Sequence, residues 1–539
     1  MKLRKILLQL NAGELYTNEE LMEREYSYAV ATDMMSNVML GNVDDSILIT
    51  SLVNPQVIRA SEMMNISSII ITGGKTVDES MIELAENRNI ALATTELPTF
   101  TVCGKLHNLG LTEGPTTEAT ENITSILPID ERCKGCVHCV RICPTEAIRI
   151  RDRKAKVDPK RCIECGMCVK VCPRHAMKPL VDSMEIMEGY DYRVAIPSSA
   201  FLGQFEDVKS RNHLLTALKQ LGFDDVYEEA IGAEIVSNAT RRKVSAAARE
   251  GRPLISSGCP SVLKLIQMRF PNLIDRVLEY KPPVEIVAEL ARKKAEEKYP
   301  DRKVGVFFIA PCTSKISFIK TSEGEEEESH VDGMIAISDV YRQVLTRLKD
   351  LKDSEVEDLE KTGVTGLRWT SPGGESLALG TDRFIAVDGI PEIIEIFEQL
   401  EDEKLENLDF IEADACVGGC LGGSLTVKDP YSARANMKRL VDEAKRKYGG
   451  RFLNTCDNTH DIERTKKLKY NSVLQLDDDL KVALKKMEEM GRVLRELPGI
   501  DCGVCGAPTC RAFAEDVIRG TMPEKACFIN RKNRDFQSK

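Results

Sequence analysis

The chain of 539 residues lacks a long apolar run, and it lacks an excess of positive charge. No apolar stretch is long enough to span a bilayer, so membrane insertion is not expected. The formal net charge is −11 and no basic stripe stands out, which argues against a nucleic-acid partner. The apolar stretch close to Met1 is too short for a signal peptide, and a charged segment follows it. We therefore expect a cytoplasmic protein.

Cysteine, by contrast, is abundant, with 18 copies. A reducing compartment disfavours structural disulfides, so metal binding is the better interpretation of so many thiols. Sixteen of the 18 cysteines fall into arrangements typical of iron–sulfur cluster ligands. The other two, Cys103 and Cys456, are interpreted as ordinary residues, because Cys456 and His460 together supply only two ligands. The length is too great for one hydrophobic core and indicates roughly three to five domains.

The first 115 residues predict a small α/β domain. Short β-rich runs at 46–50, 67–72 and 90–94 alternate with helix-like stretches near 54–64 and 76–87, and this alternation is typical of a parallel sheet. The Gly-rich turn after the second run could hold an anion at a helix N-terminus. We favour the simpler interpretation of a tight turn with Thr76 as the N-cap.

Three segments of this region stand out, at residues 31–36, 52–59 and 71–74. They resemble the DRTGG domain, a small module of the regulatory kind. The resemblance covers about the first 110 residues and implies a sensing or docking role, without identifying a ligand. The segments are Ala31-Thr32-Asp33-Met34-Met35-Ser36, Leu52-Val53-Asn54-Pro55-Gln56-Val57-Ile58-Arg59 and Ile71-Thr72-Gly73-Gly74.

Residues 124–180 contain one cysteine spacing twice, and this spacing is that of a bacterial two-cluster ferredoxin. Three cysteines at i, i+3 and i+6 reach three corners of one cubane, and the fourth, followed by proline, reaches the other cluster. A zinc site needs only four cysteines and would not explain the doubled run. We therefore assign Cys133, Cys136, Cys139 and Cys172 to a first [4Fe–4S] cluster, and Cys162, Cys165, Cys168 and Cys143 to a second.

Four further cysteines are scattered in sequence but share a local context. Cys259, Cys312 and Cys416 each follow a predicted strand, at 253–257, 304–310 and 408–413, and Cys420 lies four residues after Cys416. In a parallel α/β sheet the loops at the carboxyl ends of the strands face one crevice, where ligands bind. A buried core position would explain one such cysteine, but four in matching loops predict one shared cofactor.

The segments around these cysteines resemble the three H-cluster motifs of the [FeFe] hydrogenases, over about residues 190–450. The resemblance implies that the four cysteines bind a [4Fe–4S] cubane, that Cys420 bridges to a diiron subcluster with CO, CN⁻ and dithiolate ligands, and that Lys315 contacts a cyanide. The segments are Ser256-Ser257-Gly258-Cys259-Pro260, Ala310-Pro311-Cys312-Thr313-Ser314-Lys315 and Glu412-Ala413-Asp414-Ala415-Cys416-Val417-Gly418-Gly419-Cys420-Leu421-Gly422-Gly423.

The chain departs from the motifs of high-turnover members of that family. In the first motif, this chain has Gly258 where those members have a proton-relaying cysteine, and Val262 where they have a tryptophan. In the third motif, it has Asp414 where they have a methionine. The acidic stretch that continues the proton path corresponds, on a looser alignment, to Ser237-Asn238-Ala239. With ligands kept and the proton route lost, the chain resembles the sensory [FeFe] hydrogenases. Asp414 is a candidate proton donor, or else a carboxylate hydrogen-bonded to loop amides.

The C-terminal region predicts a fourth cubane. An amphipathic helix at 477–495 is expected to use its apolar face, which includes Leu480 and Leu484, for core packing. The spacing Cys502-x2-Cys505-x4-Cys510-x16-Cys527 follows and resembles the [4Fe–4S] domain of the corrinoid iron–sulfur protein and related electron-transfer subunits. A structural zinc is the alternative for this motif.

The sequence thus predicts a multidomain α/β and α+β protein. Its expected parts are a DRTGG-like regulatory domain (1–115), a ferredoxin-like 2[4Fe–4S] insert (124–180), an H-cluster domain with parallel sheets flanked by helices (190–450), and a helix with a C-terminal helical [4Fe–4S] unit (470–539).

The function that follows is slow, reversible H2 oxidation and proton reduction by a sensory-type [FeFe] hydrogenase. The expected cofactors are four [4Fe–4S] clusters and the diiron subcluster, whose presence in a given preparation the sequence leaves open. The expected partners are an electron-transfer protein such as ferredoxin, or a signalling protein, and a homo-oligomer is left open. The alternative is a non-catalytic iron–sulfur scaffold that binds only a cubane at the H-cluster cysteines.

Overall fold

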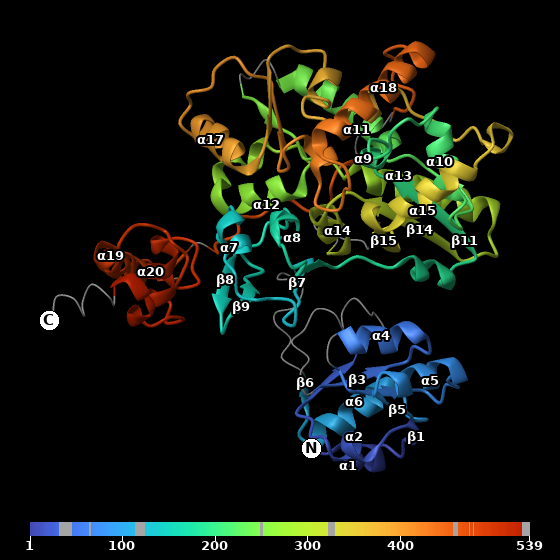
Figure 1. Ribbon diagram of the computed structural model, residues 1–539, viewed down its shortest axis with the longest axis vertical. Coiled ribbons are helices and arrows are strands. Elements are labelled where there is room, and N and C mark those ends of the chain that lie inside the picture. Colours follow the sequence, from blue (N-terminus) through green and yellow to red (C-terminus); the bar gives the residue numbers. More distant parts are fainter. Residues whose placement is uncertain are drawn as a thin grey trace. The chain divides into compact units, whose positions relative to one another are not determined.

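A computed structural model describes the chain apart from a few short segments (Figure 1). Residues 32–36 of the first DRTGG-like segment, the stretch 114–123, Cys456 and His460 lie outside the described residues. The chain divides into two compact units, 1–123 and 124–539. The described ranges are 1–31, 46–63, 66–113, 124–247, 252–321, 329–455, 462–473, 475–477 and 479–530.

The first unit is built on a six-stranded sheet in the order β1-β5-β4-β3-β2-β6, and it confirms the predicted α/β fold. All strand pairs are parallel except β1 with β5. Every residue of β3 is buried, as expected for a strand covered on both faces. The strands are β1 Gly13–Tyr16, β2 Tyr28–Ala31, β3 Ser46–Thr50, β4 Ser68–Ile71, β5 Ala91–Thr94 and β6 Thr112–Glu113.

The helices of this unit are α1 Leu3–Gln9, α2 Glu19–Glu23, α4 Pro55–Met63, α5 Glu79–Asn87 and α6 Thr99–Asn108. The prediction that Thr76 caps a helix is wrong, because α5 begins three residues later and its N-cap is Asp78. Cys103 lies in α6 and packs half-buried against the core, in keeping with an ordinary role.

The second unit begins with the ferredoxin-like region. Strands β7 Ile126–Pro128 and β10 Met177–Pro179 pair antiparallel and bring its two ends together. The hairpin of β8 Ile148–Arg151 and β9 Lys154–Val157 lies between the two cysteine motifs in sequence. Each motif continues into one short helix, α7 His138–Ile142 or α8 Met167–Val171.

Two separate parallel sheets follow. The first has the order β12-β11-β14-β15 and the second the order β13-β17-β16. The expectation of a single crevice along one sheet is therefore corrected: Cys312 follows β14 of the first sheet, whereas Cys259 and Cys416 follow β13 and β17 of the second. The strands are β11 Tyr192–Pro197, β12 Asp225–Val226, β13 Leu254–Ile255, β14 Val304–Ala310, β15 Gly333–Ala336, β16 Phe384–Asp388 and β17 Phe410–Asp414.

Helices surround these sheets and bury their apolar residues in three hydrophobic clusters. Strand β14 is buried along its whole length, since its apolar residues have helices or strands on every side. The helices are α9 Ser199–Leu202, α10 Arg211–Lys219, α11 Ala230–Ala247, α12 Pro260–Arg269, α13 Pro283–Lys298, α14 Thr313–Lys320, α15 Ile337–Asp350, α16 Val364–Arg368, α17 Ile390–Glu401 and α18 Pro430–Tyr448.

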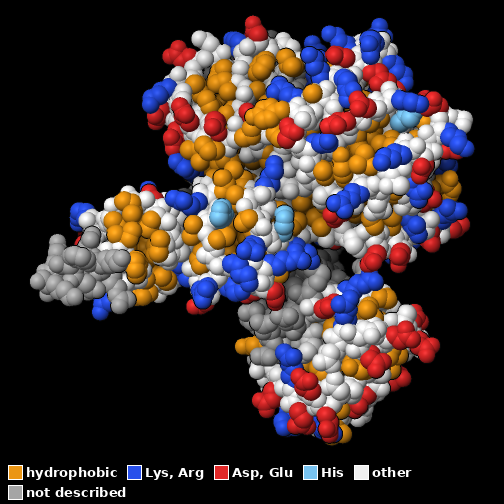
Figure 2. All heavy atoms as spheres, in the orientation of Figure 1, with side chains coloured by type: hydrophobic (Ala, Val, Ile, Leu, Met, Phe, Trp, Pro, Cys, Tyr) orange, Lys and Arg blue, Asp and Glu red, His pale blue; other side chains and the backbone are white. Residues whose placement is uncertain are grey.

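The C-terminal region consists of α19 Leu480–Glu496, α20 Cys510–Ile518 and the turns that join and follow them. The prediction that the apolar face of α19 packs into a core is wrong for most of its length. Leu480 is 72% exposed and Leu484 53% exposed, whereas Val493 is fully buried. Hydrophobic side chains accordingly gather on the visible face of this region (Figure 2).

Among the helices of the described ranges, none combines the length and the apolar character that a membrane crossing requires.

Candidate metal centres

A cavity lies where the carboxyl ends of the two sheets of the hydrogenase-like region meet. Residues that follow β11, β12 and β14 line it from one sheet, and residues of β17 and those that follow β13 line it from the other. Four of the predicted site residues reach it, namely Gly258, Lys315, Asp414 and Cys420. The structure also places Ser199, Glu229, Ser256, Trp369, Glu375 and Glu412 in its wall.

The four scattered cysteines converge beside this cavity. Cys259 and Cys312 occupy the N-cap positions of α12 and α14, where each strand turns into its helix. Burial raises the pKa of the Cys416 thiol well above its usual value, and the neighbouring thiols of Cys312, Cys259 and Cys420 raise it further. Buried thiolates so close together need a compensating cation, and a metal cluster is the ordinary one.

Glycine allows the chain to turn sharply between the last two of these cysteines. Gly418 and Gly419 both adopt the left-handed conformation, with φ of 83° and 68°. A Cβ at Gly419 would lie 2.6 Å from the carbonyl oxygen of Thr370, so a larger residue would clash with the backbone. The turn Gly419–Gly422 can therefore present Cys420 to the cavity only with glycine at these positions.

Lys315 is a buried cation in the cavity wall. Burial alone would lower its pKa, but the Glu229 carboxylate and the Cys420 thiol raise the pKa above its usual value. Its ammonium donates to Glu229, which also accepts a hydrogen bond of 2.7 Å from the hydroxyl of Ser198. The positive charge next to Cys420 therefore has a built-in partner, which the sequence motif did not reveal.

Three carboxyl groups lie together on the other side of the cavity wall. Burial raises the pKa of Glu375 well above its usual range, and the nearby Glu412 raises it further. Burial and Glu412 also raise the pKa of Asp414 well above its usual range. Glu412 accepts three hydrogen bonds, two of them from Ser376, and among the described residues none is found to the carboxylate of Asp414. The structure therefore does not support the alternative in which loop amides donate hydrogen bonds to the Asp414 carboxylate.

Gly258 lies in the wall without a left-handed backbone. A Cβ at this position would lie 3.3 Å from both Ser256 and Trp369 and 3.7 Å from Glu375. The Trp369 indole is itself held by a 2.7 Å hydrogen bond to Ser237, one of the residues aligned with the missing acidic stretch. A side chain at position 258 therefore fits only if Ser256 and Trp369 shift by a small amount.

The cysteines of the ferredoxin-like region are supplied with backbone donors. The amide of Ala155 donates to Cys133 at 3.3 Å, that of Ala147 to Cys143 at 3.2 Å, and that of Ala176 to Cys172 at 3.2 Å. Such N–H groups stabilise thiolates and tune iron–sulfur clusters. Burial raises the pKa of Cys139 to about 11 and that of Cys162 to about 12, so both sulfurs need a metal to remain charged.

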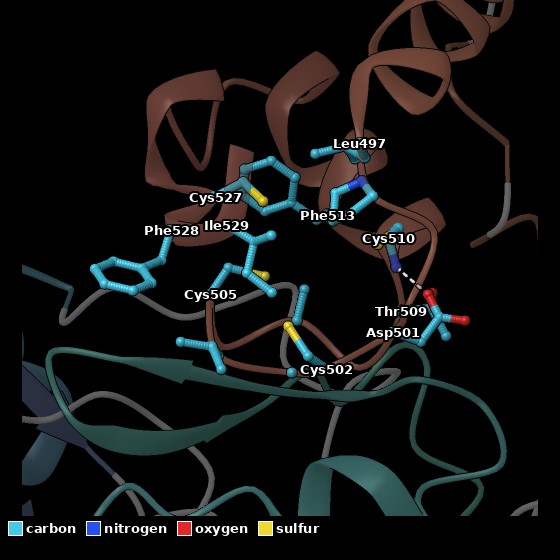
Figure 3. A pocket seen from close by; sticks show the side chains of 14 residues that line it. Leu497, Asp501, Cys502, Cys505, Thr509, Cys510, Phe513, Cys527, Phe528 and Ile529 are labelled. Atoms are coloured by element: carbon cyan, nitrogen blue, oxygen red, sulfur yellow. Dashed lines mark hydrogen bonds between the residues drawn. The ribbon is translucent and has the colours of Figure 1, made fainter. Parts of the chain in front are cut away.

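The four C-terminal cysteines line one cavity. Cys502, Cys505 and Cys527 come from loops that surround it, and Cys510 begins α20 (Figure 3). The Asp501 carboxylate accepts a 2.6 Å hydrogen bond from the amide of Cys510. A cavity lined by four thiols fits an iron–sulfur cubane.

Sequence reasoning missed Glu229, Glu375 and Trp369. Each comes from a segment outside the cysteine motifs, and an isolated glutamate has no spacing that marks it. The one available signal was that Trp369 is the only tryptophan of the chain and precedes the turn Ser371-Pro372-Gly373-Gly374.

Comparison with known families confirms the domain types that the sequence resembled. The chain contains a DRTGG domain, a 4Fe–4S dicluster domain, an Fe–S cluster domain and the C-terminal domain of the iron-only hydrogenase large subunit. The matched residues are 5–109 for the DRTGG domain, 132–176 for the dicluster domain, 191–376 and 336–424 for the hydrogenase domain, and 497–529 for the Fe–S cluster domain.

Individual relatives are more distant. Iron hydrogenase 1 of Clostridium pasteurianum is 23% identical over 260 residues, which is 39% of this chain and 44% of that protein. The NADP-reducing hydrogenase subunit HndD of Solidesulfovibrio fructosivorans is 22% identical over 228 residues, 40% of this chain and 36% of that protein. The chain thus spans less than half the length of these curated relatives. The [FeFe]-hydrogenase HydA1 of Chlamydomonas reinhardtii is a structural match with a TM-score of 0.39 and 15% identity, over 52% of this chain and 95% of that one.

Proposed function

We propose that the protein is a sensory-type [FeFe] hydrogenase that slowly and reversibly interconverts H2 with protons and electrons. One observation carries the proposal: Cys420 and the buried cation Lys315 face the same cavity, beside the three other cysteines of the hydrogenase motifs. A bridging thiolate next to a cation is the arrangement that an anionic diiron subcluster requires.

Cys259, Cys312, Cys416 and Cys420 would hold the cubane, and Cys420 would bridge to the diiron subcluster. When bound, the diiron subcluster supplies the site where H2 is formed or split. Lys315 would bind an anionic cyanide ligand, and Glu229 would keep Lys315 charged and oriented. Gly258 offers no proton, so the nearest candidate proton carriers at the cavity would be Glu375 and Asp414, whose carboxyl pKa values burial raises.

Electrons would leave through the two clusters of the ferredoxin-like region and the C-terminal cluster. Together with the cubane at the hydrogenase cysteines, these three clusters give four cubanes in all. The partner would be a small electron-transfer protein such as ferredoxin, or a signalling protein, and the DRTGG domain would dock or regulate it. We expect this to take place in the cytoplasm, without nucleic acid. A homo-oligomer is compatible with the proposal.

A second function is a non-catalytic redox scaffold that carries the cubane at these four cysteines and never acquires the diiron subcluster. The ion pair between Lys315 and Glu229 favours it, because the lysine then has a partner without any cyanide. Gly258 favours it as well, because a scaffold needs no proton relay.

Infrared spectroscopy of the anaerobic, matured protein separates the two functions. A hydrogenase will show CO and CN⁻ stretching bands, which fall where protein scarcely absorbs, and four cubanes with a diiron centre will give about 18 iron atoms per chain. Protein with about 16 iron atoms and no such bands after maturation would support the scaffold. Zinc in place of iron at the Cys502 motif would refute the C-terminal assignment.

A further inference from the structure

The C-terminal cysteine unit is clamped to the ferredoxin-like region by two adjacent carboxylates of α20. Asp516 accepts hydrogen bonds from Arg149 at 2.8 Å and from Arg151 at 2.6 Å, and its side chain is only 9% exposed. The neighbouring Glu515 pairs with the buried Arg161. Three arginines from one domain thus hold two adjacent acids of the other, in a geometry that solvent screens weakly.

The backbones of the two domains also touch next to the cysteines. Gly506, which follows Cys505, accepts a 2.8 Å hydrogen bond from the amide of Ile150 in β8. Any Cβ at Gly506 would lie 2.2 Å from the carbonyl oxygen of Ile150, so only glycine permits this approach. Ile150 is paired with Ala155 of β9, whose amide donates to the Cys133 sulfur at 3.3 Å. The β8–β9 hairpin therefore lies between the C-terminal cysteine loop and the first ferredoxin-like cluster site, and it contacts both.

A second contact reaches the same cluster site. A Cβ at Gly503, the residue after Cys502, would lie 3.6 Å from the side chain of Val137. Val137 stands between Cys136 and Cys139 in sequence, so two separate points of the C-terminal loop adjoin the first cysteine motif.

The second cysteine motif contacts the hydrogenase domain as well as the C-terminal unit, which it meets through Arg161 and Glu515. The backbone of Gly166, next to Cys165, adjoins Ser424, because a Cβ there would lie 2.3 Å from the serine side chain. The hydroxyl of Thr313, which follows Cys312, donates to the carbonyl of Glu164 at 2.7 Å. The loop around Cys165 therefore lies directly against loops that carry the hydrogenase cysteines.

We propose that the C-terminal cluster is the outermost member of a single electron path that runs from it to the Cys133 cluster, then to the Cys162 cluster, and then to the hydrogenase cubane. Each step transfers one electron: one [4Fe–4S] cluster is oxidised from the 1+ to the 2+ state as its neighbour is reduced from 2+ to 1+. This order rests on the proposed electron-transfer role of the clusters, but it does not require a diiron subcluster. Asp516, Glu515 and the three arginines are positioning residues for the outermost step.

Electron paramagnetic resonance of the full-length anaerobic protein, reduced with dithionite, tests the order. The resonance of the C-terminal cluster is identified as the one missing in Cys502→Ala. In the wild type we expect this resonance to be split or broadened by the neighbouring reduced cluster. Cys136→Ala, at an exposed ligand position, should abolish the splitting, and Cys162→Ala should leave it intact.

Asp516→Asn tests the clamp, because it removes one charge and leaves the shape and the cluster ligands unchanged. We expect it to weaken or abolish the splitting at unchanged iron content. Glu496→Gln removes one charge from α19 at a residue that pairs within its own helix, and the splitting should persist.

Three results would overturn the proposal: no splitting in fully loaded wild type, splitting lost in Cys162→Ala but kept in Cys136→Ala, or splitting unaltered in Asp516→Asn. None of these depends on the CO and CN⁻ bands. Failure of the electron order and failure of the hydrogenase assignment can therefore be told apart in the same preparations.

Discussion

Position 258 carries no side chain, and its neighbours would have to shift slightly to admit one. Its backbone is not left-handed, and a Cβ would approach Ser256 and Trp369 at 3.3 Å, a distance that small shifts accommodate. Gly258→Cys should therefore fold and place an acid beside the cavity. A positioned acid typically contributes about 10²–10⁴-fold, and we expect a gain in H2 production at the lower end, because Ser237 and its neighbours supply no acidic path beyond it. The measurement is H2 production per diiron centre, quantified by infrared.

Gly258→Ser is the matched control, since serine has nearly the same size but no acidic thiol. It should give little or no gain. Equal activity of glycine and cysteine variants at equal diiron loading would mean that proton delivery through position 258 does not limit turnover.

The carboxyl of Glu375 makes stability depend on pH. Its pKa in the folded protein is raised by burial and by Glu412, whereas an unfolded glutamate titrates near about 4.3. Between these two values the unfolded state binds fewer protons, so the free energy of unfolding falls as pH rises, by up to about 1.4 kcal/mol per pH unit for one proton. Above the raised pKa this fall ends.

Glu375→Gln should keep the hydrogen bond from Ser256 and remove this pH dependence. Anaerobic thermal unfolding between pH 5 and pH 9 measures it: the variant should gain stability over wild type as pH rises. Parallel curves for the two proteins would show that Glu375 is ionised in the fold already.

At the scale of elements, α19 shows what periodicity can and cannot predict. Its apolar face was readable from the spacing of Leu480 and Leu484, but the spacing does not say whether another element covers that face. Only Val493 near its C-terminal end is fully buried, against Phe513 and its neighbours around the C-terminal cysteines. The strands before the hydrogenase cysteines could also be predicted from a local pattern of apolar residues. Their division between two sheets could not be predicted, because strands that pair lie far apart in sequence.

The same contrast gives a prediction for α19. Val493→Ala removes two buried carbon atoms and should destabilise the C-terminal unit by about 2 kcal/mol. Leu484→Ala, at a position that is 53% exposed, should change stability by no more than about 0.5 kcal/mol. Thermal loss of the iron–sulfur absorbance, followed in a Cys133→Ala background to reduce overlapping signals, compares the two. Equal destabilisation by both would mean that the exposed face is covered in solution.

For the whole molecule, the cysteine motifs carried most of what the sequence predicted. The doubled ferredoxin-like spacing and the three hydrogenase segments identified the domain types, because cluster ligands must stand at fixed separations. The partners of those motifs could not be predicted. Glu229 pairs with Lys315 across 86 residues, and Arg149 with Asp516 across 367, and no local pattern records such contacts.

The two ferredoxin-like clusters stand at different points of the proposed path between the hydrogenase site and an external electron acceptor. Cys133→Ala and Cys162→Ala should each remove one cluster, and H2-dependent reduction of an external dye should fall in both. The fall should be larger in Cys162→Ala, because the Cys165 loop directly adjoins the loops of Cys312 and Cys420, and its loss isolates the hydrogenase site from every other cluster. The CO and CN⁻ bands should survive in both variants, because neither residue is a ligand of the hydrogenase cubane. Unchanged dye reduction in both variants would mean that electrons leave the hydrogenase site directly. Loss of the bands would mean that the ferredoxin-like region is needed to build the hydrogenase site rather than to carry electrons away from it.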